Sequence, residues 1–482
     1  MMGQTGHFYG RGLAGLVAVG LWAVALSGCA SLEFAEEHGA VFQQAVQASQ
    51  SGRPEMAAAA ANHYLKGATI DDPKYDRALR VLADNAERLG FSYAASLWYL
   101  DIARSRRDVE LVDDAVAGLE EISREYAYDR QTILKGFIAT ADISGLPAQQ
   151  RAFVSYHQGV DSLRRGLRKW ARDAFAEIPE NNPYGMRADY VLAVRQLARY
   201  DLEEGRERLE GLLEEELPSD LRTKVRRTLA RTEFEEKDYE AALEHYRAIQ
   251  HRAPDHPRLL LEMAWSHYYL GHYRRALGLL IALDAPVYRE LIAPRRYLLE
   301  ALSLRELCQF GPARKAATRL EQRHGGALED LYEGRPLEES TALRQAAGLR
   351  PGGRPVAEFR DRLQVEEAKI DELADDIGPA LTEKLRGIYA HGLAEAKRRE
   401  AEELSDEMRH LAQELLSAEE GVQLILHELG VALLRGQRGS TLEESDLTAG
   451  TGDRPVRYRF AGEFWTDELD DLVVQLEDRC IE

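Results

Sequence analysis

One pattern returns after 34 residues, and this repeat restricts the fold more than any other feature of the chain. Each copy has an aromatic residue, an alanine three positions later and a large residue four positions after that. The two copies are Tyr239, Ala242 and Tyr246, and Tyr273, Ala276 and Leu280. Steps of three and four residues are typical of one helix face. A repeat of this length predicts stacked helix pairs that share a continuous core, rather than separate globular domains.

The repeat resembles the tetratricopeptide repeat (TPR), whose pattern is Gly-x-Tyr-x-x-Ala with an aromatic residue and a late proline. Gly271 and Pro254 occupy the glycine and proline positions. The resemblance implies that the alanine lies where two helices cross, that the aromatic residue fills the space beside it, and that the proline ends the second helix. The packing positions implied in this way are Gly159, Ala171, Phe175, Tyr239, Ala242, Tyr246, Gly271, Tyr273, Ala276, Phe310 and Ala313.

Weaker copies extend the pattern in both directions. They begin near Gly52, Gly90, Gly166 and Cys308, and two longer gaps each leave room for one degenerate copy. We therefore predict a helical solenoid over residues 35–325, with no strands in this region. Most of its aromatic residues, including Trp98, Trp170 and Trp265, are expected in the core, and a few are expected to line a concave groove.

The N-terminus reads as an export signal. A single positive charge, Arg11, precedes an apolar run over residues 13–26, which is too short to span a bilayer. The run ends at Leu26, Ser27, Gly28 and Cys29, which resemble the bacterial lipobox. The resemblance implies a signal peptide over 1–28, a diacylglycerol with acyl chains such as palmitate on Cys29, and a tether over 29–34. The absence of Asp after the cysteine implies the outer membrane, facing the periplasm or, alternatively, the cell surface. An ordinary signal peptide is the other interpretation.

The C-terminal third predicts other elements. A Gly- and Pro-containing linker is expected over 326–354, and long helices packed as a hairpin or bundle over 355–436, broken at Gly378-Pro379. Residues 437–482 predict a loop and an aromatic cap, in which a strand at 456–460 pairs with one at 472–476, or a short helix replaces the latter. Phe464 and Trp465 belong to this cap and either seal the helices or dock a partner. Together, the solenoid and the C-terminal segments predict an all-α chain with a small β-hairpin-like cap.

No catalytic or metal chemistry is predicted. The chain has no phosphate-binding loop, no HExxH, no GxSxG and no CxxC, and its 13 histidines are scattered. A net charge of −20 argues against nucleic-acid binding. We expect no cofactor, no metal and no small-molecule substrate, only covalent lipid. Cys308 and Cys480 can form a disulfide in an oxidising compartment if their Cα atoms lie within about 7 Å.

These features predict a non-enzymatic scaffold that binds another envelope protein through a TPR groove and is tethered to the outer membrane by lipid. The combination resembles pilotins and the helical-repeat lipoproteins of barrel assembly, secretion and motility machines. The alternative is a cell-wall-handling enzyme or an accessory subunit of one. Candidate partner-binding residues, chosen from the first helices of the stronger repeats, are Arg226, Glu233, Leu260, His267 and Tyr297, with Phe464 and Trp465 in the cap.

Overall fold

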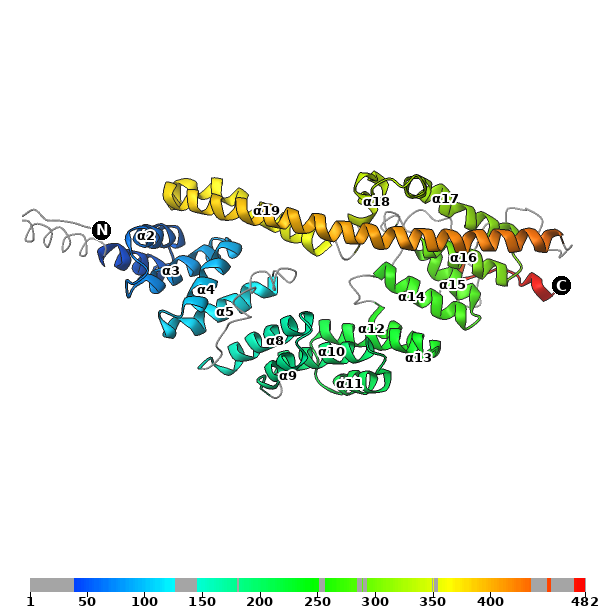
Figure 1. Cartoon of the computed structure of the whole chain (residues 1–482), viewed down its shortest axis with the longest axis horizontal. Coiled ribbons are helices and arrows are strands. Elements are labelled where there is room, and N and C mark those ends of the chain that lie inside the picture. Colours follow the sequence, from blue (N-terminus) through cyan, green and yellow to red (C-terminus); the bar gives the residue numbers. More distant parts are fainter. Residues whose placement is uncertain are drawn as a thin grey trace, which may run out of the picture. The chain divides into compact units, whose positions relative to one another are not determined.

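The protein is seen here as a computed structural model, which describes residues 39–125, 145–179, 182–250, 256–283, 288, 293–348, 350, 354–434, 449–451 and 472–481. The chain forms two compact units, one of Met1–Leu119 with Glu366–Tyr389 and one of Glu120–Val365 with Ala390–Glu482. Each unit is described by itself. Both consist of helices packed in antiparallel pairs (Figure 1), so the predicted all-α class is confirmed.

The first unit begins with a helix over 39–50, followed by helix pairs whose crossing points are occupied by alanine. Its further helices are α2 (Pro54–Gly67), α3 (Tyr75–Arg88), α4 (Ser92–Ser105), η1 (Val109–Leu111) and the start of α5 (Val112–Glu125). Ala57, Ala78 and Ala95 are fully buried. Because alanine has the smallest side chain that still favours a helix, neighbouring helices can approach closely at these positions.

The second unit contains five pairs of described helices. They are α8 (Ala148–Arg164) with α9 (Arg168–Ala176), α10 (Pro183–Leu197) with α11 (Leu202–Glu214), α12 (Ser219–Glu235) with α13 (Tyr239–Ile249), α14 (His256–Tyr269) with α15 (Tyr273–Ala282), and α16 (Arg295–Glu306) with α17 (Phe310–Tyr332). Each turn between paired helices contains a residue with positive φ. These residues are Gly166, Tyr200, Lys237, Gly271 and Cys308. A left-handed residue ends the first helix and directs the chain into the second.

Several of the residues implied to pack the repeats are buried, whereas Gly271 is exposed in the turn between α14 and α15. Ala171, Ala242, Ala276 and Ala313 are at most 1% exposed, and Tyr246 and Phe310 are buried. A Cβ built on Gly159 would lie 2.2 Å from Cε1 of Phe175, so the ring occupies the space that the glycine leaves. Tyr239 and Tyr273 are half-buried. Trp170 differs from the expectation for the aromatic residues, because it is 71% exposed.

The expected linker over 326–354 is wrong for most of its length. Helix α17 runs through Gly325 and Gly326 to Tyr332, and η4 (Leu337–Glu339) and α18 (Thr341–Gly348) follow. Two glycines in a helix cost about 1 kcal/mol each. Burial of Ala327 and Leu328 on the same helix, and of Leu343 and Ala347 on α18, outweighs that cost because these side chains join one hydrophobic core.

The long helix α19 (Arg354–Leu434) turns back on itself at the predicted break. Gly378 has φ 75 and ψ 163, which is not helical, and Pro379 begins the second arm. The arms are antiparallel: Asp371 pairs with Arg386 in the first unit, and Arg360 pairs with Glu400 in the second. Beyond residue 400, buried apolar side chains of the second arm pack against α16, α17 and α18. The predicted long-helix hairpin is therefore present.

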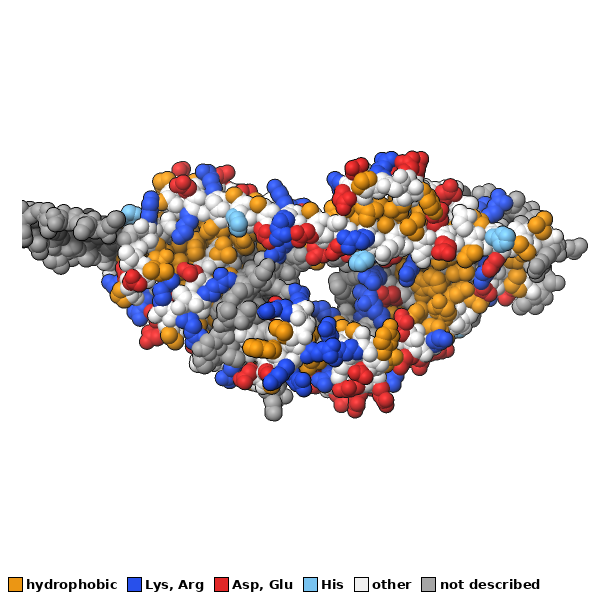
Figure 2. Space-filling view, in the orientation of Figure 1, with side chains coloured by type: hydrophobic (Ala, Val, Ile, Leu, Met, Phe, Trp, Pro, Cys, Tyr) orange, Lys and Arg blue, Asp and Glu red, His pale blue; other side chains and the backbone are white. Residues whose placement is uncertain are grey.

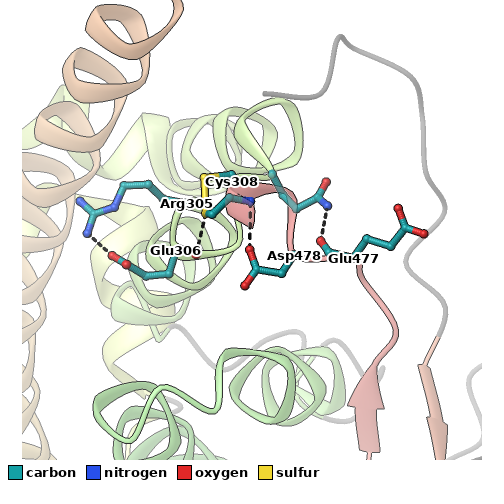
Figure 3. The surroundings of a disulfide bond; sticks show 7 residues. Arg305, Glu306, Cys308, Glu477 and Asp478 are labelled. Carbon is teal, nitrogen blue, oxygen red and sulfur yellow. Dashed lines mark hydrogen bonds and ion pairs between the residues drawn. A yellow bond between two sulfur atoms is a disulfide. The ribbon is translucent and has the colours of Figure 1, made fainter. Parts of the chain in front are cut away.

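A small sheet and a disulfide end the described chain. Strand β1 (Ala449–Thr451) pairs antiparallel with β2 (Leu472–Val474), with Gly450 opposite Val473. We expected a loop at 449–451; a sequence of Ala, Gly and Thr gives no strand signal, but its backbone can still pair with β2. The predicted strand at 456–460 lies outside the described residues. A short helix, η6 (Arg479–Ile481), contains Cys480, which is bonded to Cys308 with their Cα atoms 5.2 Å apart (Figure 3).

Candidate functional site

A groove of about 490 Å³ lies in the second unit, along the first helices of three successive pairs. Residues of α12, α14 and α16 line it, together with Tyr246 of α13 and with Ser417 and Ala418 of α19. The first helices of a solenoid of helix pairs face its concave side, which is the usual binding surface of such arrays. Figure 2 shows hydrophobic side chains gathered over α14 and α15.

Four aromatic rings form a continuous shelf at the groove. The ring of Tyr269 stacks on Tyr239 at 4.9 Å between centroids, and it also contacts Trp265 at 5.9 Å and Phe234 at 5.7 Å. Tyr269 is 51% exposed, although such rings are usually covered. Rigid aromatic side chains that remain open to solvent offer a large contact area at a small entropic cost, which is typical of protein-binding surfaces.

Beside this shelf, three arginines converge on one carboxylate. Glu262 accepts a hydrogen bond from Arg231 at 2.6 Å and forms ion pairs with Arg258 at 3.4 Å and Arg227 at 3.5 Å. Burial raises the pKa of the Glu262 carboxyl, but the hydrogen bond from Arg231 and the charges of the three arginines outweigh it and hold that pKa below its ordinary value. The carboxylate is therefore ionised at neutral pH, and three cations on one anion leave a local surplus of positive charge.

One more arginine and one more carboxylate line the groove. Arg295 lines the groove next to Leu298, and Glu235 lies at the end of α12. On α19, Glu414 is held by Arg350 at 2.9 Å, and the charges of Arg295 and Arg258 also help to lower the pKa of its carboxyl, so this carboxylate compensates part of the positive charge of the groove arginines. The groove thus combines apolar aromatic surface with arginines that can donate hydrogen bonds to carboxylates of another molecule.

The residues chosen from the sequence for partner binding lie elsewhere on the same helices. Leu260 is fully buried, and Glu233 and His267 are 8% and 4% exposed. Burial, together with nearby arginines, lowers the pKa of His267 to about 4, so its ring is neutral. Tyr297 packs its ring edge against His324 at 5.8 Å. None of these residues, nor Arg226, lines the groove.

The groove residues that sequence reasoning missed share a recognisable spacing. Arg258, Glu262, Trp265 and Tyr269 follow one another at steps of four, three and four, which places them on one face of α14. Arg231 and Phe234 are related in the same way on α12. Phe464 and Trp465, and the lipobox Leu26, Ser27, Gly28 and Cys29, lie outside the described residues.

The second unit contains a further hollow. This hollow of about 680 Å³ lies between α17, α18 and α19, and is lined mainly by alanine and leucine together with Arg323, His324 and Gln345. Within the described ranges, no three His, Cys, Asp or Glu residues are grouped so that they could hold a metal ion. None of the helices described is both long and apolar enough to cross a membrane.

With this geometry in view, comparison with known proteins identifies the repeat. A family model described as tetratricopeptide repeat matches residues 233–289, which include α13, α14 and α15. This segment is a tetratricopeptide repeat. The matched segment contains most of the groove residues, and TPR modules bind other proteins.

Two solved structures resemble the chain. The crystal structure of yeast Tom70 is 14% identical, over 84% of this chain and 91% of that one, with a TM-score of 0.28. The structure of the P58(IPK) TPR domain is 12% identical, over 81% of this chain and 99% of that one, with a TM-score of 0.20. No match was found among curated proteins.

Proposed function

We propose that this protein is a membrane-anchored scaffold that holds another envelope protein in the groove along α12, α14 and α16. The observation that carries the proposal is the aromatic shelf around Tyr269 beside the arginines that surround Glu262. Both features lie on or beside α12 and α14, the first helices of two successive pairs, where a partner would have access to more than one repeat. No part of the groove needs to perform chemistry for this function.

The groove chemistry favours a partner segment with carboxylates next to aromatic or aliphatic side chains. Arg231 and Arg258 are 45% and 57% exposed while they contact Glu262, so each retains donors that an incoming carboxylate can use. The shelf would cover the apolar side chains of such a segment. Complementary charge would fix the register of the segment and increase the association rate. The aromatic rings of the shelf, once covered by the partner, would supply most of the affinity.

The second arm of α19 supports this use of the surface, because it packs against the next repeat in the way that a bound helix would. A Cβ built on Gly421 would lie 2.8 Å from Cδ1 of Leu298, so α19 approaches α16 closely at a glycine. Leu298 also lines the groove. The chain thus uses part of its concave surface internally and leaves the adjoining part, over α12 and α14, open.

The localisation of the protein in the cell envelope is part of the same proposal. Cys29 would carry the lipid that holds the protein at the outer membrane, which would restrict the search for a partner to one surface and raise its effective concentration. The disulfide between Cys308 and Cys480 fits an oxidising compartment outside the cytosol. The family of machines to which the partner belongs, whether motility, pilus, secretion or barrel assembly, is open in this proposal.

Site-specific crosslinking in cells tests the groove. A photoreactive amino acid at Tyr269 should crosslink one envelope protein, and Arg258→Glu should abolish that adduct because it reverses the charge that receives the partner's carboxylate. Lys315→Glu is the matched control, since Lys315 is exposed on α17 and does not line the groove. An adduct that survives Arg258→Glu, or the absence of any adduct, would contradict the groove assignment.

Cell fractionation tests the attachment to the membrane independently of the groove. Cys29→Ala should release the protein from the membrane fraction into the soluble periplasm, because the acyl chains supply the anchor. Full retention of the Cys29→Ala protein at the membrane in high salt, which screens surface charge, would refute a lipid anchor at this cysteine.

A further inference from the structure

The turn between α8 and α9 concentrates positive charge in an acidic protein. Residues 164–172 contain five basic side chains and no acidic one, while the whole chain has a net charge of −20. The five are Arg164, Arg165, Arg168, Lys169 and Arg172, and all are exposed. Figure 2 shows Lys and Arg side chains gathered with hydrophobic ones over α8 and α9.

The cations of this turn are poorly neutralised. Arg165 forms an ion pair with Asp161 at 3.6 Å, and Asp173 flanks the turn on the other side. Among the described residues, Arg164, Arg168, Lys169 and Arg172 form no ion pair. Long basic side chains without a partner produce a local positive potential, which reaches about 10 Å into solution at ordinary salt.

Two large apolar side chains are exposed among these basic residues. Trp170 is 71% exposed and Leu167 is 38% exposed, whereas their neighbour Ala171 is 1% exposed and packs in the repeat. Trp170 is therefore not part of the core, although a tryptophan in a folded protein usually has most of its surface covered. Its position at the tip of a helix pair makes it accessible to a flat surface rather than to a segment in a groove.

We propose that the α8–α9 turn, defined as residues 164–172, binds the surface of a membrane that contains anionic phospholipid headgroups. Tryptophan prefers the interface between headgroups and acyl chains, and arginine and lysine beside it contact phosphate groups. Acidic protein fits the charge, and nucleic acid fits the charge and can stack its bases on tryptophan, but neither accounts for the exposed leucine beside them. The inference does not depend on what the groove binds.

The proposed contact would give the protein a second attachment to the membrane. A single lipid signal holds a protein reversibly, and stable anchoring needs either further acyl chains or a basic patch. A contact at the α8–α9 turn would also fix how the second unit faces the membrane, which a single lipid attachment at Cys29 would not do by itself. It would therefore orient the repeats as well as hold them.

Vesicle sedimentation tests the proposal with a chain that lacks residues 1–28 and carries Cys29→Ser, which retains every described residue. We expect this protein to sediment with vesicles of mixed phosphatidylglycerol and phosphatidylcholine, but not with phosphatidylcholine alone. Arg168→Gln with Lys169→Gln should lower the partition coefficient about 25-fold, since each cation contributes a factor of about five. Trp170→Ala should lower it roughly tenfold by removing the apolar contact.

Matched controls separate the patch from general charge and folding effects. Arg314→Gln with Lys315→Gln removes an adjacent exposed pair of cations on α17, and Leu424→Ala removes a side chain that is 60% exposed on α19. Both controls should bind as the parent does, and all variants should retain the same far-UV circular dichroism. Equal binding to neutral vesicles, or equal losses in patch and control variants, would overturn the proposal. Loss with the charge variant but none with Trp170→Ala would also overturn it and indicate a site for polyanions.

Discussion

Replacement of Gly159 by alanine should destabilise the second unit, although alanine normally stabilises a helix. Gly159 lies inside α8, and a Cβ built there would be 2.2 Å from Cε1 and 2.5 Å from Cδ1 of Phe175. The ring is rigid and lies in the helix pair, so it cannot move aside as the end of a flexible chain would. The added methyl group must therefore separate α8 from α9.

The expected magnitude follows from comparison with a glycine that has free space. No atom lies within 4 Å of a Cβ built on Gly325, which is also inside a helix, α17. Gly325→Ala should raise the free energy of unfolding by about 1 kcal/mol, through helix propensity alone. The same propensity term acts in Gly159→Ala, so the difference between the two variants measures overpacking, about 1–3 kcal/mol.

Urea unfolding followed by far-UV circular dichroism measures both variants, and hydrogen exchange of the α8 and α9 amides localises the effect. Phe175→Leu in the Gly159→Ala background should recover part of the lost stability, because the methyl group then meets a smaller side chain. If Gly159→Ala is as stable as Gly325→Ala, the close packing of α8 on Phe175 is refuted.

Three other changes have defined outcomes. Cys480→Ser should make residues 472–481 sensitive to protease and lower the free energy of unfolding by up to about 5 kcal/mol, since the disulfide closes a loop over a separation of 172 residues. Thermal unfolding without reducing agent that matches the parent protein would contradict this. Glu366→Ala should cost about 1–3 kcal/mol and speed exchange of the Tyr93 amide, which donates to this buried carboxylate at 3.1 Å. The pKa of Glu262 lies below its ordinary value of 4.5, so this residue contributes stability that is present above pH 4.5 and is lost as the pH falls through the lowered pKa. Glu262→Gln should therefore flatten the curve of unfolding free energy against pH below pH 4.5. An unchanged curve would rule out the pairing of Glu262 with Arg231.

The stacking of helix pairs was predictable because it depends on side-chain size. Only a small residue fits where two helices cross, so Ala242 and Ala276 had to recur with the repeat, and both are fully buried. The break at Gly378-Pro379 was predictable for a similar reason, since few other residues adopt the backbone angles of Gly378. These features are dictated by local sterics, which the sequence displays directly.

The end of the array was not predictable in the same way. Gly325 and Gly326 favour a break, yet α17 continues because Ala327 and Leu328 behind them are buried in a core that includes residues of α19. The partner of β2 was equally hidden, since the Ala-Gly-Thr sequence of β1 has no alternating apolar pattern. In both cases the deciding contact comes from a distant part of the chain, and a local pattern cannot contain it.

The face of α14 that lines the groove shows why binding residues are harder to predict than packing residues. Each first helix packs against its own partner helix and against the neighbouring repeats, so apolar residues such as Leu259, Leu260 and Met263 cover much of its circumference and leave no wide polar stripe. A successive residue lies 100° further around the helix, so an error of one or two positions moves a candidate from the groove into the core. Leu260 and Glu262 differ by two positions, and only Glu262 lines the groove. Binding residues in such a helix are better predicted by requiring aromatic and charged residues to share one face at steps of three and four, a requirement that Glu262, Trp265 and Tyr269 satisfy and Leu260 does not.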